Sequence, residues 1–359
     1  MAEKSSYKTK TDAHSLQLAQ KILTELPPYA KDYMNSKYSS ASAQTILQYT
    51  YSLRTFFVWL SSAVPELQNA PMSHISLDTL SALTPRDFDE FMIYLQTNHG
   101  SRNSRASVAQ KLSAIGSLFN YLFRNDLIPS DPTTKVERPK TTKDNRIIYL
   151  TDEECIRLLD AIEFGSDLVP THQQHYLEAT RCRDLAIATL MLDTGIRLSE
   201  CVGLNIEDVN LAARKIQIYR KGGKYQYLPL NDEVVEILTA YLTERKAISA
   251  ADKDAEKALF LSMQKTRLER TAINNMIRKY ARLAGINKPI TPHKLRKTYG
   301  TALYQKTRDI YLTANALGHE NIATTSRHYV NDAEDSLRAV ANSVSVRKNS
   351  ASGKITDNE

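Results

Sequence analysis

The sequence predicts a mostly helical protein with a small antiparallel β-sheet, an α+β fold. Apolar residues recur at intervals of three and four between residues 14 and 125, as on the buried face of amphipathic helices. Further along, two segments of alternating apolar and polar residues flank a Gly-Gly pair, which predicts a β-hairpin. At 359 residues, 42% of them hydrophobic, the chain is long enough for two or three domains with real cores.

The first domain is expected at residues 13–128, behind a flexible segment at residues 1–12. Two apolar stripes, Tyr49–Leu60 and Leu112–Leu122, predict helices that pack in its core. Apolar periodicity and helix start signals place the helices of this domain near residues 14–26, 28–38, 41–63, 84–98 and 104–125.

Basic side chains surround the last of these helices and suit contacts with a phosphate backbone. Hydroxyl-bearing residues begin an earlier helix, between Tyr38 and Gln44, and a helix N-terminus attracts phosphate. For any single one of these residues, a solvated surface position is an equal alternative. The basic candidates for DNA binding around the last helix are Arg102, Arg105, Lys111 and Arg124.

Residues 129–148 are expected to form an extended linker, because they hold three prolines and several charges but almost no apolar periodicity. The second domain is expected at residues 149–342. Near its start, Thr151 and Glu154 have the spacing of a helix capping box. The polar residues 343–359 are expected to form a flexible tail.

Composition narrows the function classes without choosing one. The 47 Lys and Arg residues exceed the 40 Asp and Glu residues by seven, and this modest excess suits a protein that contacts phosphates. Three cysteines without ligand spacing argue against a disulfide framework or a zinc site. The sequence shows no signal peptide, no membrane span, no Walker loop and no paired acidic site, so we expect a cytoplasmic protein without metal or other cofactor.

One pair of histidines, His172 and His175, has a spacing that metal ligands can use. No carboxylate or cysteine partner stands at a suitable distance along the chain, and the local sequence is typical of a loop. We therefore expect no metal site there.

The densest group of chemically useful side chains lies in the second domain. Thr291-Pro-His-Lys-Leu-Arg296 is followed by Leu317-Gly-His319 and, ten residues later, by Tyr329. Two imidazoles, a guanidinium and a phenol are the groups that a metal-free attack on a phosphodiester needs. His293 and Arg296 are three residues apart, so one face of a helix can present both to a phosphate.

Two further segments supply groups for the same chemistry. Gly195 ends an apolar helical run and puts Arg197 at a helix junction, where a guanidinium can be held to bind two phosphate oxygens. The Gly-Gly turn of the hairpin carries Lys221 on one side and Lys224 on the other. Taken alone, these two lysines fit a solvated turn better than a site.

Together, Thr194-Gly-Ile-Arg-Leu-Ser-Glu200, Arg220-Lys-Gly-Gly-Lys224 and the later motifs resemble the tyrosine recombinase (phage-type integrase) family, from about Ala13 to Asn342. Within that family the chain is most similar to the Xer branch, in its single-protein type. Lys297 stands where many members have histidine, so packing or DNA contact there is expected to differ. The residues that match the family's six catalytic positions, in order, are Arg197, Lys221, His293, Arg296, His319 and Tyr329.

The resemblance implies a helical, SAM-like core-binding domain followed by a catalytic domain, and a transesterification that needs neither metal nor ATP. Tyr329 is then the nucleophile, which attacks the scissile phosphorus and forms a 3′-phosphotyrosine bond. Arg197 and Arg296 hold the non-bridging oxygens and offset the negative charge of the transition state.

The remaining three positions handle hydrogen bonds and protons. His319 is expected to donate a hydrogen bond to the same phosphate, and His293 to accept or return a proton near the phenol. Lys221 is expected to protonate the 5′-oxygen as it leaves. Lys224 is the second candidate for that role, because it lies on the same hairpin turn.

The partners implied are double-stranded DNA at a specific recombination site, a homotetramer that joins two sites, and a cell-division DNA translocase; no membrane is implied. The expected role is Xer-type resolution of chromosome dimers through a Holliday junction. An integrase or excisionase of a mobile element is the main alternative, although the short segment before Ala13 leaves no room for the arm-binding domain that would favour it. Alternatives from other classes are a type IB topoisomerase and an inactive DNA-binding module.

Overall fold

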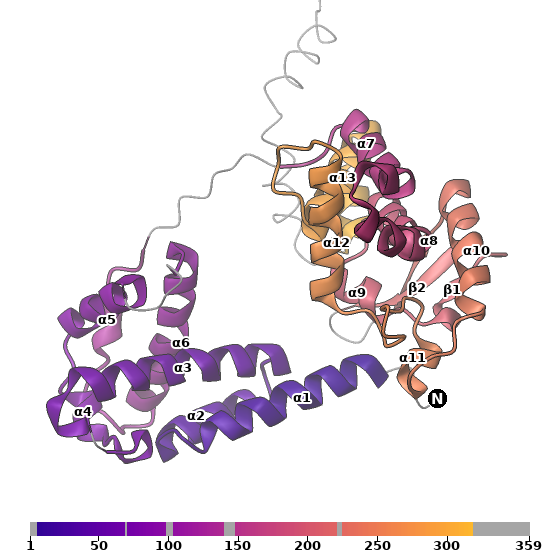
Figure 1. The fold of residues 1–359 in the computed structure, drawn as a ribbon. Helices are drawn as coiled ribbons and strands as arrows, with labels where there is room; N and C mark the ends of the chain where they lie inside the picture. Colours follow the sequence, from indigo (N-terminus) through magenta and orange to yellow (C-terminus); the bar gives the residue numbers. More distant parts are fainter. Residues whose placement is uncertain (1–5, 69, 98–102, 140–147, 221–224, 319–359) are drawn as a thin grey trace, which may run out of the picture. The chain divides into compact units, whose positions relative to one another are not determined.

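The computed structural model describes residues 6–68, 70–97, 103–139, 148–220 and 225–318. The chain divides into two compact units, Met1–Asp144 and Asn145–Glu359. Both units are mostly helical, and the second also contains a three-stranded antiparallel sheet (Figure 1). The predicted fold class, mostly α with a small antiparallel β-sheet, is therefore confirmed.

The first unit is a bundle of helices joined by short turns. Three of its helices begin at a serine whose hydroxyl accepts a hydrogen bond from a backbone N–H three residues on: Ser42 before α3, Ser76 before α4 and Ser104 before α6. The α-helices are α1 (Ser6–Leu23), α2 (Pro28–Lys37), α3 (Ala43–Ala63), α4 (Leu77–Ser81), α5 (Pro85–Thr97) and α6 (Arg105–Arg124). Short 3-10 turns are η1 (Pro65–Leu67), η2 (Met72–His74) and η3 (Pro132–Lys135).

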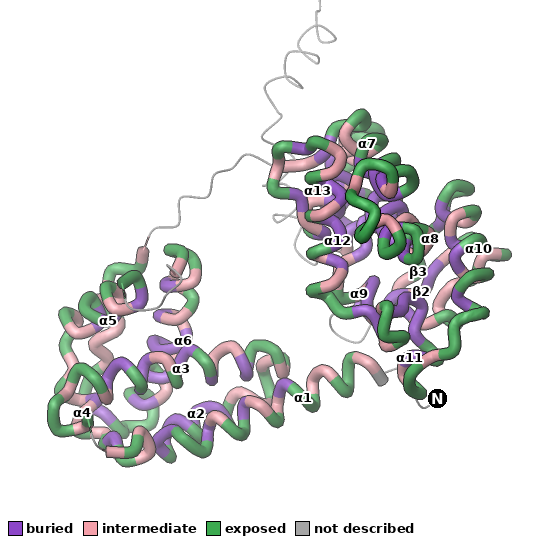
Figure 2. Tube along the Cα trace, in the orientation of Figure 1, coloured by how far each residue is buried: buried purple, intermediate pink, exposed green. Residues whose placement is uncertain are grey.

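Buried positions run along the helices of this unit (Figure 2), and many of the side chains that they bury are aromatic. The ring of Phe56 on α3 lies 5.4 Å from that of Phe91, edge to face, and 6.0 Å from that of Phe88, stacked. Phe119 on α6 contacts both Phe56 and Phe88. The two predicted apolar stripes thus meet in one core. Their buried residues are Leu53, Phe56, Phe57 and Leu60 in the first stripe and Leu112, Ile115, Phe119 and Leu122 in the second.

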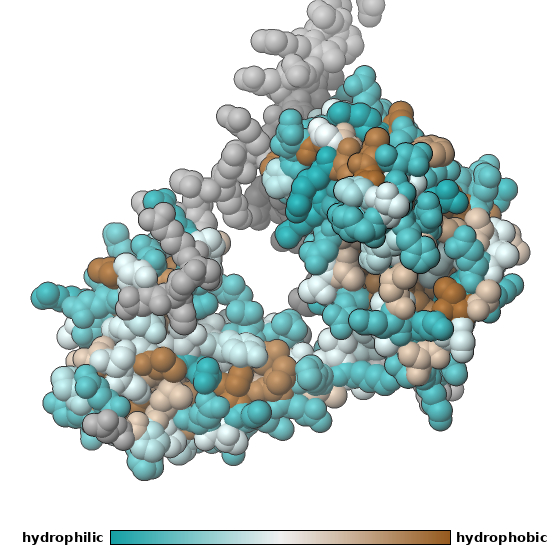
Figure 3. All heavy atoms as spheres, viewed as in Figure 1, coloured by the Kyte–Doolittle hydropathy of each residue, from teal (hydrophilic) through white to brown (hydrophobic). Residues whose placement is uncertain are grey.

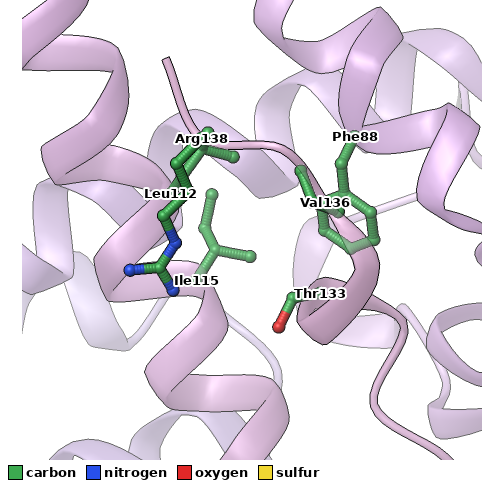
Figure 4. Close-up of a pocket in the computed structure, with 6 residues that line it drawn as sticks. All are labelled: Phe88, Leu112, Ile115, Thr133, Val136 and Arg138. Carbon is green, nitrogen blue, oxygen red and sulfur yellow. The ribbon is translucent and has the colours of Figure 1, made fainter. Parts of the chain in front are cut away.

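The chain after α6 folds back over that helix before the second unit begins. Val136 packs against the core, and Arg138 extends across α6 to the hydroxyl of Ser113, 3.4 Å away (Figure 4). A Cβ on Gly116 would come within 3.2 Å of the Arg138 guanidinium, so the glycine leaves room for this crossing. Val136 and Arg138, which belong to the expected linker, therefore contact the first unit.

The second unit contains the following elements. Its helices are α7 (Asp152–Glu163), α8 (Thr171–Thr194), α9 (Leu198–Gly203), α10 (Asp232–Lys246), α11 (Lys253–Lys257), α12 (Arg270–Leu283), α13 (Pro292–Thr307) and α14 (Ile310–Leu317). The 3-10 turns η4 (Gly165–Leu168) and η5 (Ile206–Asp208) precede α8 and the sheet. The strands are β1 (Val209–Asn210), β2 (Lys215–Tyr219) and β3 (Tyr225–Pro229). The predicted capping box of Thr151 and Glu154 opens α7.

The predicted hairpin is formed by β2 and β3, which pair from Lys215 opposite Pro229 to Tyr219 opposite Tyr225. Its inner face buries Ile216, Ile218 and Leu228. Because side chains alternate along a strand, a residue two positions beyond Ile218 belongs to the same inward register. That residue is Arg220.

The sequence prediction of a loop around His172 and His175 was wrong, because both residues lie in the first half of α8. Only Leu177 and Thr180 are buried between Thr171 and Arg183, which leaves little apolar periodicity for a sequence pattern to show. The helix α8 packs against α7, α10 and α13. Within the described part of the chain, no group of three or more His, Cys, Asp or Glu side chains is placed to hold a metal.

Hydrophilic residues predominate on the face shown in Figure 3. None of the described helices is both long and apolar enough to cross a membrane.

Candidate active site

A glycine at the end of α8 sets the position of Arg197. Gly195 has φ +60°, in the left-handed region that favours glycine. A Cβ at this position would come within 2.4 Å of the Tyr299 ring on α13, so space as well as backbone conformation requires glycine. The chain leaves α8 through this residue and enters α9 three residues later, at Leu198, with Arg197 as the N-cap residue.

Glu200 holds the Arg197 side chain in place. Its Oε1 accepts a hydrogen bond of 2.8 Å from Arg197 Nη1, and its Oε2 accepts one of 2.9 Å from the Arg197 backbone N–H. The Glu200 side chain is only 5% exposed, whereas that of Arg197 is 35% exposed. A buried carboxylate therefore orients a guanidinium that still reaches solvent.

Helix α13 carries His293 and Arg296, one turn apart, as predicted. Pro292 occupies the first turn, where the missing N–H has no intrahelical partner. His293 is exposed, whereas Arg296 is buried and donates to the carbonyl of Gly195 and to that of Leu317. Arg296 thus connects the α8–α9 junction with the end of α14.

The last turn of α14 is where the arginines meet. The helix ends at Gly318, which has φ +59°. Helix C-terminal carbonyls lack intrahelical donors and carry partial negative charge, so they attract cations. Arg197 Nη2 donates to the Gly318 carbonyl at 2.8 Å, and Arg296 Nη2 donates to the Leu317 carbonyl. These bonds bring Arg197 and Arg296, two of the predicted residues, to the turn that immediately precedes His319 in the sequence.

A third arginine, Arg220, reaches the same carbonyls. It follows β2, is 7% exposed, and donates to Leu317 through Nη1 and to Ala316 through Nη2, the second bond being 3.0 Å long. We predicted no role for it from sequence. The signal that could have found it is the alternation of the strand, which places a guanidinium at an inward position in register with Ile216 and Ile218.

The charges around these arginines act on one another. Burial lowers the pKa of the Arg220 guanidinium, the Glu200 carboxylate raises it, and the neighbouring charge of Arg197 lowers it. On α13, burial lowers the pKa of the Lys297 ammonium, and the charge of Lys294 lowers it further. Lys297 is therefore a partly buried amine that follows Arg296 in the sequence.

The DNA-binding candidates of the first unit are spread over α6. Arg105 lies exposed in its first turn, and Arg124 lies exposed in its last turn. They are nineteen positions apart along the helix, a rise of roughly 28 Å. Lys111 is partly buried between them. The remaining candidates that lie outside the described residues are Arg102, Lys221, Lys224, His319 and Tyr329.

Comparison with known families assigns both units. Residues 134–335 match the model of the phage integrase family, and residues 25–137 match that of the phage integrase SAM-like domain. The chain is 31% identical to the tyrosine recombinase XerS of Streptococcus uberis, over 86% of this chain and 93% of the relative. Identity to XerS of Streptococcus pyogenes serotype M6 is also 31%, with the same coverage.

Solved structures share the fold. The XerH site-specific recombinase bound to a palindromic difH substrate, in a post-cleavage complex, aligns with a TM-score of 0.62 at 23% identity, covering 85% of this chain and 82% of that one. The Tn1549 transposon integrase in complex with circular intermediate DNA also aligns with a TM-score of 0.62, at 18% identity, over 91% and 98% of the two chains.

The chain belongs to the phage integrase family, and it is a tyrosine site-specific recombinase, an enzyme that breaks, exchanges and rejoins DNA strands. The resemblance stated from sequence motifs, to the tyrosine recombinases and to their Xer branch, is confirmed by these relatives.

Proposed function

We propose that six residues form the active site of this recombinase, and that the enzyme resolves chromosome dimers at a specific DNA site. The convergence of Arg197 and Arg296 on the carbonyls of Leu317 and Gly318 is the observation that carries the assignment. Those carbonyls directly precede His319 in the sequence. The six proposed residues are Arg197, Lys221, His293, Arg296, His319 and Tyr329.

The first step is attack by the Tyr329 phenol on the scissile phosphorus. The bond from phosphorus to the 5′-oxygen breaks as the phosphotyrosine bond forms, so the ester is conserved and no external energy source is required. Arg197 and Arg296 bind the non-bridging oxygens, where negative charge grows in the transition state. Arg197 has five N–H donors and uses two of them on Glu200 and Gly318, which supports a further role in binding phosphate.

Protons move at the two ends of the reacting group. His293, exposed on the first turn of α13, takes the phenol proton, and His319 hydrogen-bonds a phosphate oxygen. Lys221 donates a proton to the departing 5′-oxygen, with Lys224 as the second candidate. In the return reaction a 5′-hydroxyl from the partner DNA attacks the phosphotyrosine, and each proton moves back.

Two DNA-binding domains joined by a linker can close around a duplex. We assign the core-binding domain to residues 13–128, the linker to 129–148 and the catalytic domain to 149–342. The separation of Arg105 and Arg124 along α6 supports contact with phosphates spread over a length of DNA. The proposed DNA contacts are Arg102, Arg105, Lys111, Arg124 and Lys224.

The role in chromosome dimer resolution is supported by the XerS relatives, which match most of the length of this chain. We further propose that four protomers assemble on two DNA sites and exchange strands in pairs through a Holliday junction. A cell-division DNA translocase is the proposed regulatory partner.

A genetic experiment tests this role. Chromosome dimers arise by homologous recombination, so a strain with Tyr329→Phe should segregate its chromosomes poorly, and the defect should disappear when homologous recombination is disabled. Chromatin immunoprecipitation of the Phe variant should recover one site near the replication terminus. Recovery of the ends of a mobile element, with normal segregation, would instead assign the protein to that element.

A biochemical experiment separates recombination from topoisomerase activity. Purified protein should form a complex of four protomers with two copies of the recovered site, measured by light scattering, and should exchange strands between them. Relaxation of supercoiled DNA without the site, by single protomers, would contradict the proposal.

A further inference from the structure

Arg220 is a buried cation that the proposed chemistry does not use. Its side chain enters the protein from the end of β2, and among the described residues no carboxylate forms a salt bridge with it. Its Nε is likewise buried without a hydrogen-bond partner in the described part of the chain. Burial of a guanidinium is unfavourable unless its donors are well placed, so the bonds that it does form are informative.

Those bonds attach the hairpin to the end of α14. Arg220 donates to the carbonyls of Leu317 and Ala316 through its two terminal nitrogens. The guanidinium lies directly against the backbone of Gly318, where a Cβ would overlap it. No side chain larger than hydrogen fits between the two, so Arg220 and Gly318 form one close contact.

The end of α14 is held by other side chains besides Arg220. Arg197 holds the Gly318 carbonyl and Arg296 holds that of Leu317, independently of Arg220. Besides Arg220, the described residue of the hairpin that hydrogen-bonds α14 is Gln226, whose Nε2 lies 3.3 Å from the Asn315 carbonyl. Loss of Arg220 therefore leaves α14 attached by two arginines, whereas the end of β2 loses two charged hydrogen bonds to α14.

We propose that Arg220 is a positioning residue for protonation of the leaving group: it fixes the end of β2 against α14 and so sets where the next residue, Lys221, can act. This inference rests on the proposed role of Lys221. In that step the bond from phosphorus to the 5′-oxygen breaks, the phenolic oxygen takes its place on phosphorus, and Lys221 gives its proton to the 5′-oxygen.

A substrate with sulfur in place of the bridging 5′-oxygen tests the proposal, because a thiolate leaves without a proton. Wild-type protein and variants are compared on oxygen and sulfur suicide substrates under single-turnover conditions, per DNA-bound protein. Arg220→Ala should cleave the oxygen substrate roughly 10²-fold more slowly than wild type, the scale of a lost general acid, and the sulfur substrate within about 3-fold of wild type. Lys221→Ala should behave in the same way.

Two further variants keep the test decisive. Arg220→Lys keeps the charge and most of the volume but cannot donate to two carbonyls from a planar fork, so it should show the same rescue by sulfur even if the alanine variant folds poorly. Gln226→Ala is the matched control, since it removes a single neutral bond between the same two elements. It should cleave both substrates within about 3-fold of wild type.

The outcomes distinguish the positioning role of Arg220 from the acid role of Lys221. Rescue of Lys221→Ala and of the Arg220 variants supports both proposals. Rescue of Lys221→Ala alone, with the Arg220 variants equally slow on both substrates, overturns the positioning role and leaves the active site as proposed. Failure of sulfur to rescue Lys221→Ala overturns the assignment of the leaving-group acid and, with it, the action of Arg220 through Lys221.

Discussion

Arg197 donates a 2.8 Å hydrogen bond from Nη2 to the backbone carbonyl of Gly318, 121 residues further along the chain. This bond attaches the α8–α9 junction to the end of α14. Since Gly318 immediately precedes His319, one contact relates a proposed phosphate-binding arginine to the segment that carries a proposed phosphate-binding histidine. Changes that move Arg197 should therefore affect the chemistry more than the affinity for DNA.

Glu200→Gln should slow DNA cleavage while site binding stays nearly normal. The carboxylate accepts from both the guanidinium and the backbone N–H of Arg197, and an amide has only one oxygen to offer. A lost hydrogen bond to a charged group is worth about 1.5–3 kcal/mol, which corresponds to roughly 10- to 100-fold in rate. Single-turnover cleavage and gel-shift titration measure the two effects.

Glu163→Gln is the matched control for this change, because Glu163 is exposed at the end of α7. It should cleave at the wild-type rate. A Glu200→Gln protein as active as this control would show that the carboxylate does not orient Arg197.

Gly195→Ala should destabilise the protein more than Gly285→Ala. Both glycines have positive φ, +60° and +64°, so each alanine adds about 1–2 kcal/mol of backbone strain. Only at Gly195 would the new Cβ overlap a neighbour, the Tyr299 ring, whereas nothing lies within 4 Å at Gly285. Urea denaturation of the two variants should differ by at least about 1 kcal/mol. Equal losses would mean that the Tyr299 ring gives way freely.

The charge of Glu154 should stabilise the protein only above the pH at which this carboxyl titrates. Burial raises the pKa of Glu154, but hydrogen bonds from Lys288 and from the Thr151 backbone lower it, with a net shift below the ordinary value of 4.5. A depressed pKa gives stability that is present above the unfolded-state pKa and is lost as pH falls through the folded-state value.

Glu154→Gln keeps the oxygen that can cap α7 but removes the charge that Lys288 contacts at 2.6 Å. At neutral pH the variant should be less stable than wild type by up to about 1 kcal/mol, and the difference should vanish in acid below the carboxyl range. Urea denaturation across this pH range measures it. A difference that is the same at neutral and acid pH would assign the effect to packing and not to charge.

The sequence predicted the elements that a regular pattern marks. The stripes around Phe56 and Phe119 are core because apolar spacing of three and four leaves one helix face for burial. The hairpin follows from alternation on both sides of Gly-Gly, and α7 begins at the Thr151 capping box. The arginines Arg197 and Arg296 were found by motif, and the structure brings them to one turn.

Features that depend on distant partners left no local pattern. Arg220 Nη1 donates to the backbone carbonyl of Leu317, 97 residues further along the chain. Every residue has a backbone carbonyl, so no residue type in the sequence marks this partner. The first half of α8 keeps most of its side chains exposed, so its helical structure leaves no apolar periodicity in the sequence. Glu200, which orients Arg197, is only three residues away in the sequence. The turn that Arg197 contacts, at Gly318, is brought close only by the fold.

The central claim is that Tyr329 becomes covalently joined to DNA, and a nicked suicide substrate carrying the recombination site tests it most directly. Wild-type protein should form a complex that survives denaturing electrophoresis, and peptide mapping should place the nucleotide on Tyr329. Tyr329→Phe should bind the same site with unchanged affinity and form no such complex. A denaturation-resistant adduct with the Phe variant, or a nucleotide mapped to another residue, would contradict the account.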